Sequence, residues 1–244
     1  MKQFKFGFTV IEMMTAMAII GVAASFVIPL AVKSYNKHQS EIVLGRAVEH
    51  ITQGNQNIIQ LANMNNGTGS YTDELGVITK EDLYLSATGE DKTESVLNNL
   101  SKYIRPYWNL SADTVDNEKL SENIKNFNGE KKQDSPHVTN IKNGSAFNFQ
   151  KLSASVILSP PEGGADPENS SSDTGYLIYI DTTGLSTPPN TFGKDIFCFH
   201  LINDGSLVPL GMGDFSEDPD GVPTNNGLEY TEQVVKDRFR ITYY

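Results

Sequence analysis

Glu12 is the residue whose chemistry fits its surroundings least. The stretch from Phe8 to Val32 is almost entirely apolar, and this carboxylate stands near its start. Ionisable groups near the centre of a bilayer cost roughly 2.5 kcal/mol or more, and they usually mark function. One local partner is available, because Thr9 followed by Glu12 has the spacing of a helix capping box. The sequence therefore leaves two roles open for Glu12, a functional charge and a helix cap.

A second set of carboxylates lies far along the chain, in front of Gly221. Carboxylate oxygens wrapped around a cation, with a glycine at the turn, are typical of calcium loops. The spacing does not match the EF-hand order, which places a glutamate at the twelfth position. A solvated acidic loop is the alternative, and the sequence predicts no other cofactor. The calcium candidates are Asp214, Glu217, Asp218 and Asp220.

Catalytic motifs do not emerge from the rest of the sequence. HExxH, GxSxG and CxxC are absent, and the four histidines are scattered. Carboxylate pairs for glycoside hydrolysis converge only in the fold, and no pattern favours them. Cys198 is the single cysteine, so the chain cannot close an intramolecular disulfide, and its apolar surroundings predict a small buried side chain. The sequence predicts a protein that is not an enzyme.

The charge balance argues against direct binding to nucleic acid. The chain carries 19 Lys and Arg against 30 Asp and Glu, which gives a formal net charge of −11. Neutralising phosphates requires clustered Lys and Arg. We therefore expect no nucleic-acid partner through direct charge.

Glu12 directly precedes an apolar run from Met13 to Val32, which is interrupted by Gly21 and Pro29. About 20 apolar residues suffice for a helix to cross a bilayer. An ordinary cleaved secretory signal is one alternative, but its apolar core has only about 7–15 residues. A plain signal anchor with a capping box is the other. Neither alternative accounts for the Gly-Phe pair that precedes the run.

The polar leader supplies the rest of a recognisable pattern. Lys2 and Lys5 lead to the Gly7–Phe8 junction, and Glu12 is the fifth residue after that junction. Together with the long apolar helix, these residues resemble the N-terminus of type IV prepilins and of type II secretion pseudopilins. The resemblance covers about the first thirty-five residues. It implies a class III signal peptide, cleavage after Gly7 by a prepilin peptidase, methylation of Phe8 and an assembly role for Glu12.

The same resemblance implies partners and a location. It implies copies of the chain and other pilins or pseudopilins in a filament, together with an inner-membrane assembly platform. It also implies a single pass through the inner membrane, with the head outside and in a periplasmic or cell-surface filament after assembly. The leader is too short to form a domain, so we expect a cytoplasmic N-terminus. Major pseudopilins carry calcium in a C-terminal loop, which is relevant to the residues before Gly221.

The apolar helix continues into an amphipathic one. Apolar residues recur at helical spacing from Leu44 to Ala62, and Asn63 and the glycines after it signal a stop. A helix from Phe8 to Ala62 would be roughly 80 Å long at 1.5 Å per residue. Its second half would pack on a head.

The head is predicted from short helical and strand patterns. Helices are expected at 93–104, ended by Arg105-Pro106, at 116–127 and at 231–237. Strands rich in branched and aromatic residues are expected at 146–149, 154–158, 176–180 and 195–202. A hairpin turn would lead to an edge strand at 206–210, and a terminal strand would follow at 238–244. Segments between Asp181 and Phe197 resemble a loop-and-strand pattern found in many pseudopilin-like heads.

These patterns predict an α+β, pilin-like fold, with a long N-terminal helix packed on a head that has an antiparallel sheet. The predicted function is a structural subunit of a type IV pilus-like or type II secretion filament. The alternatives are a minor or tip pilin that binds a surface or an exported substrate, and a membrane-anchored extracytoplasmic binding protein or enzyme. The predicted parts are a leader (1–7), a spine helix (8–62, membrane-spanning over about 8–32) and a head (63–244, with a variable αβ region at 63–150 and the sheet and C-terminal loop at 146–244).

Overall fold

The computed structural model of the chain describes residues 9–64, 70–73, 76–79, 104–115, 121–131, 135–159, 176–184, 187–201, 206–211 and 227–243. The chain divides into two compact units, Met1–Gln39 and Ser40–Tyr244. Its elements are α1 (Val10–Met64), β1 (Ser70–Asp73), β2 (Gly76–Thr79), β3 (Leu110–Val115), α5 (Pro136–Asn143), β4 (Ser145–Phe149), β5 (Ser155–Ser159), β6 (Tyr176–Asp181), β7 (Ile196–Leu201), β8 (Leu207–Pro209) and α6 (Tyr230–Lys236).

Helix α1 begins and ends within two residues of the predicted limits and contains 55 residues. Pro29 lies inside it without ending it. The large apolar side chains from Val10 to Val32 are exposed, and α1 is long and apolar enough to cross a membrane. A helix satisfies its own backbone hydrogen bonds, so such a segment can face lipid.

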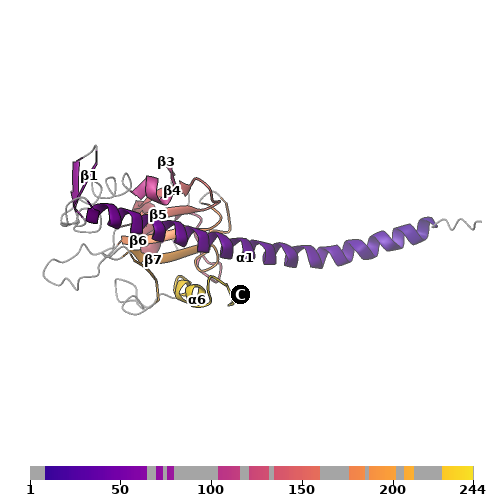
Figure 1. Cartoon of the computed structure of the whole chain (residues 1–244). Coiled ribbons are helices and arrows are strands. Elements are labelled where there is room, and N and C mark those ends of the chain that lie inside the picture. The colour runs from indigo at the N-terminus through magenta and orange to yellow at the C-terminus, as the bar shows by residue number, and fades with distance from the viewer. Residues whose placement is uncertain are drawn as a thin grey trace, which may run out of the picture. The chain divides into compact units, whose positions relative to one another are not determined.

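The second unit contains a six-stranded sheet with the order β3-β4-β5-β6-β7-β8. Figure 1 labels its strands β3 to β7. Every neighbouring pair is antiparallel, so the predicted antiparallel sheet and the α+β, pilin-like fold are confirmed. β8 is an edge strand, as Pro209 predicted, because proline has no N–H for a further ladder. Five of the six predicted strands correspond to β4 to β8. The sequence did not predict β1, β2 or β3.

One face of the sheet packs against the part of α1 that follows Gln39 (Figure 1). Leu44, Ala47 and Ile51 are fully buried there at helical spacing. They share one core with alternate residues of the strands, since successive strand side chains point to opposite faces. The strand residues in this core include Phe147, Phe149, Val156, Leu158, Ile178, Ile180, Phe197 and Phe199.

The opposite face of the sheet has a second core. Ile157, Tyr179 and Cys198 point to it from β5, β6 and β7, and Ile141 of α5 covers them. Cys198 is a buried thiol, as its apolar surroundings predicted. Because both faces are covered, the strand runs 155–159 and 196–201 are buried along their whole length.

Gly54 lets a neighbouring segment approach α1 closely. Residues 104–108 are helical, and the buried Trp108 donates an indole N–H to Asn55 Oδ1 at 2.9 Å. A Cβ atom at Gly54 would lie 2.5 Å from Trp108 Cδ1 and 2.7 Å from the Tyr107 carbonyl oxygen. At Gly45 the nearest atom would be 3.6 Å away, on Phe239. The same residue type therefore has different roles at two positions of one helix.

We expect alanine substitutions at these two glycines to have opposite effects on stability. Gly45→Ala should raise the free energy of unfolding by up to about 1 kcal/mol through helix propensity. Gly54→Ala gains the same propensity but should be destabilising overall, because overpacking costs about 1–3 kcal/mol. Thermal unfolding of the detergent-solubilised chain measures both changes. Equal melting temperatures for the two variants would contradict the close packing at Gly54.

Three local predictions in the head are wrong in the described residues. The helix predicted to end at Pro106 continues to Trp108, because burial of Ile104 and Trp108 outweighs the bias of a residue before proline. Residues 122–127 form turns and a bridge to Thr191 where a helix was predicted, and Ile124 is buried there. Residues 93–103 and 116–120 lie outside the described residues.

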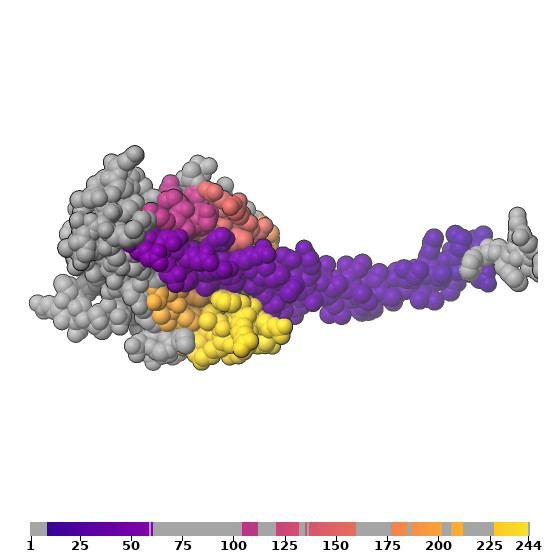
Figure 2. Space-filling model, in the orientation of Figure 1, coloured from indigo at the N-terminus to yellow at the C-terminus, as the bar shows by residue number. Residues whose placement is uncertain are grey.

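The third wrong prediction is the terminal strand, because residues 238–243 form none. Arg238 and Phe239 have φ values of 56° and 61°, which break an extended backbone. The Ile241 N–H instead donates to Glu41 Oε1 of α1 at 2.8 Å. The C-terminal segment therefore packs beside α1 (Figure 2).

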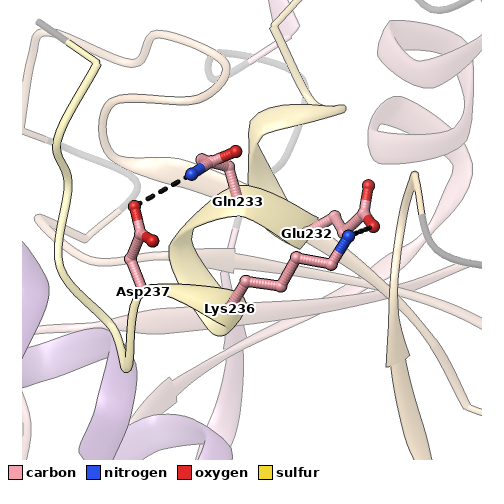
Figure 3. A network of polar contacts seen from close by, with 4 residues as sticks. All are labelled: Glu232, Gln233, Lys236 and Asp237. Atoms are coloured by element: carbon pink, nitrogen blue, oxygen red, sulfur yellow. Dashed lines mark hydrogen bonds and ion pairs between the residues drawn. The ribbon is translucent and has the colours of Figure 1, made fainter.

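Helix α6 precedes this segment and matches the helical turns predicted at 231–237. Two side-chain pairs four residues apart support it, as Figure 3 shows. Lys236 forms an ion pair with Glu232, and Gln233 Nε2 donates to Asp237 Oδ2 at 3.0 Å. At its other end, the Thr231 hydroxyl accepts a hydrogen bond from the Cys198 N–H, so α6 is joined to β7.

Candidate functional site at the start of helix α1

The predicted processing residues, Gly7 and Phe8, lie outside the described residues, which begin at Thr9. The acidic residues Asp214, Glu217, Asp218 and Asp220 also lie outside them. Cleavage after Gly7, methylation of Phe8 and calcium ligation by the four acidic residues therefore stay predictions. Among the described ranges, no group of three or more His, Cys, Asp or Glu residues gathers as a metal site.

Glu12 forms a capping box with Thr9. Glu12 Oε2 accepts hydrogen bonds from the Thr9 N–H and from Thr9 Oγ1, both at 2.8 Å. The Glu12 N–H in turn donates to Thr9 Oγ1 at 3.3 Å. This reciprocal arrangement satisfies N–H groups that a helix start leaves without partners. The helix-capping role that the sequence left open for Glu12 is therefore present in the structure.

The capping box uses only one of the two carboxylate oxygens. All the hydrogen bonds that Glu12 accepts within the described part of the chain go to Oε2, and the side chain is exposed. A carboxylate can accept about four hydrogen bonds over its two oxygens. Glu12 can therefore cap its own helix and still bind a cationic group from another molecule through Oε1.

The other polar side chains of the apolar stretch bond to the backbone of their own helix. Thr15 Oγ1 donates to the Ile11 carbonyl, and Ser25 Oγ donates to the Val22 carbonyl, each at 2.7 Å. Polar groups that lack partners are expensive in lipid. Within residues 9–32, Glu12 is therefore the charge that stands out at the start of an otherwise lipid-compatible surface.

A second polar constellation lies in the head, where β6 ends at Asp181 and β7 follows Asp195. Both carboxylates are buried, with exposed fractions of 0% and 2%. Asp181 Oδ1 accepts from the Thr183 and Gly184 N–H groups at 2.9 and 3.1 Å. Asp195 accepts from the Thr191 N–H at 2.6 Å and from the Asn190 N–H at 2.7 Å.

The Thr183 hydroxyl joins the two carboxylates. It lies 3.0 Å from Asp181 Oδ1 and 3.4 Å from Asp195 Oδ2. Burial is the main cause that raises the pKa of Asp195 from the ordinary 3.8 to about 7, and the charge of Asp181 adds to it, while the backbone hydrogen bonds from Thr191 and Asn190 oppose the rise. Burial likewise raises the pKa of Asp181 to about 6, opposed by the hydrogen bonds from Thr183 and Gly184. The two groups form a coupled pair.

Sequence reasoning missed this pair as chemistry, although it singled out the segment for its resemblance to pseudopilin-like heads. The available signal was positional, since each aspartate directly adjoins a strongly predicted strand. Asp181 pairs with Ile196 in the β6–β7 register, so Asp195 comes next to it. Burial of both carboxylates could be recognised only once the strands were paired.

Comparison with known proteins identifies the N-terminal region. Residues 3–28 match the prokaryotic N-terminal methylation motif, which is the class III signal peptide of type IV pilins and pseudopilins. The matched range contains the leader from its third residue, Glu12 and most of the apolar stretch, and the head lies outside it. No curated protein and no solved structure matches the chain.

Proposed function

We propose that the chain is a structural pilin or pseudopilin subunit that is processed between Gly7 and Phe8. The methylation motif at residues 3–28 carries this proposal, since it is the signal of a type IV pilin-like or pseudopilin-like precursor. The exposed apolar surface of α1 supports a single-span membrane anchor. Such a subunit waits in the membrane after processing and is then assembled with other pilins.

The anchor has its N-terminus in the cytoplasm and its head outside. Lys2 and Lys5 precede the apolar run, and Ser40–Tyr244, which follows it, is a compact unit. Positive charge in short flanking segments favours the cytoplasmic side, although Lys33 and Lys37 follow the apolar run. The proposed partners are copies of the chain, other pilins or pseudopilins, a prepilin peptidase and an assembly platform.

N-terminal processing is the direct test of this proposal. We expect the natural protein to begin at Phe8 with a methylated amine, as measured by intact mass and N-terminal peptide mass. Gly7→Val should leave the leader attached, because a branched side chain replaces the small residue at the junction. Gly21→Val makes the same change inside α1, where a Cβ meets nothing within 4 Å, and serves as the matched control. A native chain that keeps Met1, or that begins at Val32, would contradict the proposal.

A further inference from the structure

The β6–β7 loop holds two buried carboxylates without a cationic side chain paired to them among the described residues. Four backbone N–H groups donate to Asp181 and Asp195, and such donors stabilise the ionised form of a carboxylate. Among the described residues, no Lys, Arg or His forms an ion pair with either group. Burying a charge is costly unless it is paired. When both groups are ionised, the loop therefore contains two buried anions whose charge something must balance.

Hydrogen bonds within the loop do not satisfy its oxygen atoms. The Thr183 hydroxyl carries one proton, but it lies within 3.4 Å of three acceptors, namely Asp181 Oδ1, Asp195 Oδ2 and the Thr187 carbonyl at 3.0 Å. It can donate to one of them at a time. When both aspartates are ionised, at least two of these close oxygen contacts therefore lack a proton between them.

Two further oxygen atoms in the loop accept no hydrogen bond. Asp181 Oδ2 and Asn190 Oδ1 are sealed from solvent, and they are the two buried side-chain oxygens without a partner in the described ranges. Asn190 is only 5% exposed, and its own N–H lies 2.7 Å from Asp195 Oδ2. Buried groups without partners are rare in native proteins, and a bound ion or water is one usual reason.

A divalent cation explains these observations better than a proton or water does. A proton on Asp181 Oδ2 would have no acceptor among the described residues. A proton on Asp195 Oδ2 could be shared with the Thr183 hydroxyl, but it would leave Asp181 Oδ2 and Asn190 Oδ1 without partners. Water donates hydrogen bonds but balances no charge. Oxygen atoms from carboxylates, amides, hydroxyls and carbonyls are the ligands of Ca²⁺, which tolerates irregular geometry. Mg²⁺ usually keeps several waters, which a sealed site does not favour.

We propose that the loop between β6 and β7 binds one Ca²⁺ ion through Asp181, Asp195 and Asn190. The Thr183 hydroxyl and the Thr187 carbonyl are further oxygens within the same cluster. Binding fixes the end of β6 to the start of β7 and so stabilises the centre of the sheet. Its ligands differ from the acidic residues before Gly221, and the proposal does not depend on N-terminal processing.

The test uses the full chain in detergent after treatment with a chelator. At pH 8, a hundredfold excess of Ca²⁺ over its dissociation constant should raise the melting temperature by about 5 °C or more. The same concentration of Mg²⁺ should have a much smaller effect. Equilibrium dialysis with metal analysis should find one Ca²⁺ per chain at this site.

Variants assign the effect to the loop. Asp181→Asn and Asn190→Ala should each weaken Ca²⁺ binding at least tenfold, and the milder Asn190→Ala keeps the test valid if Asp181→Asn does not fold. The double variant Asp218→Ala with Asp220→Ala is the control and should keep the response. Failure of the native chain to bind Ca²⁺ would overturn the proposal. Loss of binding only in the double variant would overturn it too, because the ion would then belong to the other acidic segment.

Discussion

Raising the pH from 5 to 8 in the presence of a chelator is expected to destabilise the head. The folded pKa values of Asp181 and Asp195, about 6 and about 7, lie above the ordinary 3.8. Between these limits the folded chain binds more protons than the unfolded chain, so the free energy of unfolding falls as pH rises. The stabilisation is complete below about pH 4 and is lost through about pH 7. Between pH 5 and pH 8 the loss is on the order of 4 kcal/mol, because about one pH unit of titration at Asp181 and about two at Asp195 contribute roughly 1.4 kcal/mol per unit.

Melting temperature measured against pH for the full chain in detergent tests this expectation. The double variant Asp181→Asn with Asp195→Asn should lose the fall between pH 5 and pH 8, even if its absolute stability differs. Asp237→Asn is the matched control. The Thr242 hydroxyl and the Gln233 amide lower the pKa of Asp237, so this group adds stability that is lost on acidification. Equal slopes for the native chain and the double variant would show that the buried pair does not titrate in this range.

The pH dependence and the Ca²⁺ response expected for Asp181 and Asp195 are linked, but they can be distinguished. Protons and Ca²⁺ would compete for the same carboxylates, so added Ca²⁺ should reduce the loss of stability at pH 8. If the pH slope is present and Ca²⁺ has no effect, the carboxylates are balanced by protons alone. The charge on Asp181 and Asp195 would then still control stability, and only the cation site would be excluded.

The parts of the fold that could be predicted from sequence are those whose pattern is local. Helix α1 was found because its apolar residues recur at helical spacing, and its limits were correct within two residues. Strands β5, β6 and β7 were found because branched and aromatic residues dominate them. These signals require no knowledge of the partner element.

The parts that could not be predicted depend on pairing or contact. β3 contains Ser111, Asp113 and Thr114, so it lacks an apolar run, and it becomes a strand by pairing with β4 across an irregular register. Gly54 was recognised only as a weak helix former, because its contact with Trp108 joins segments that are distant in the sequence. At the candidate site, the sequence identified Glu12 and, through the spacing of Thr9 and Glu12, its capping box, whereas the use of only one carboxylate oxygen required the structure.

Glu12→Gln is expected to leave processing intact and to block assembly. Under the proposed function, cleavage after Gly7 places a cationic amine on Phe8, and staggered subunits bring Glu12 of one chain to the Phe8 amine of a neighbour. Removing one partner of a charge pair in a low-dielectric helix bundle costs roughly 3–5 kcal/mol. Membrane insertion should become slightly easier, because a costly charge has been removed.

The capping box makes this substitution selective. A glutamine keeps a side-chain oxygen that can accept the Thr9 hydrogen bonds, as the capping-box pattern allows. Glu12→Gln therefore removes the charge and keeps the cap. Thr9→Val does the reverse, since it removes the hydroxyl that receives the Glu12 N–H and keeps the carboxylate. Loss of a helix cap costs only about 0.5–2 kcal/mol.

The two variants together decide which role Glu12 has. Processed protein is measured in the membrane fraction and in the sheared-filament fraction for the native chain and for each variant. If the charge acts between subunits, Glu12→Gln accumulates as processed protein in the membrane, while Thr9→Val still reaches filaments. The opposite result, in which Glu12→Gln assembles like the native chain and Thr9→Val fails, would reduce Glu12 to a helix cap. The open Oε1 favours the first result, because a carboxylate that caps through one oxygen can bind a neighbour's amine through the other.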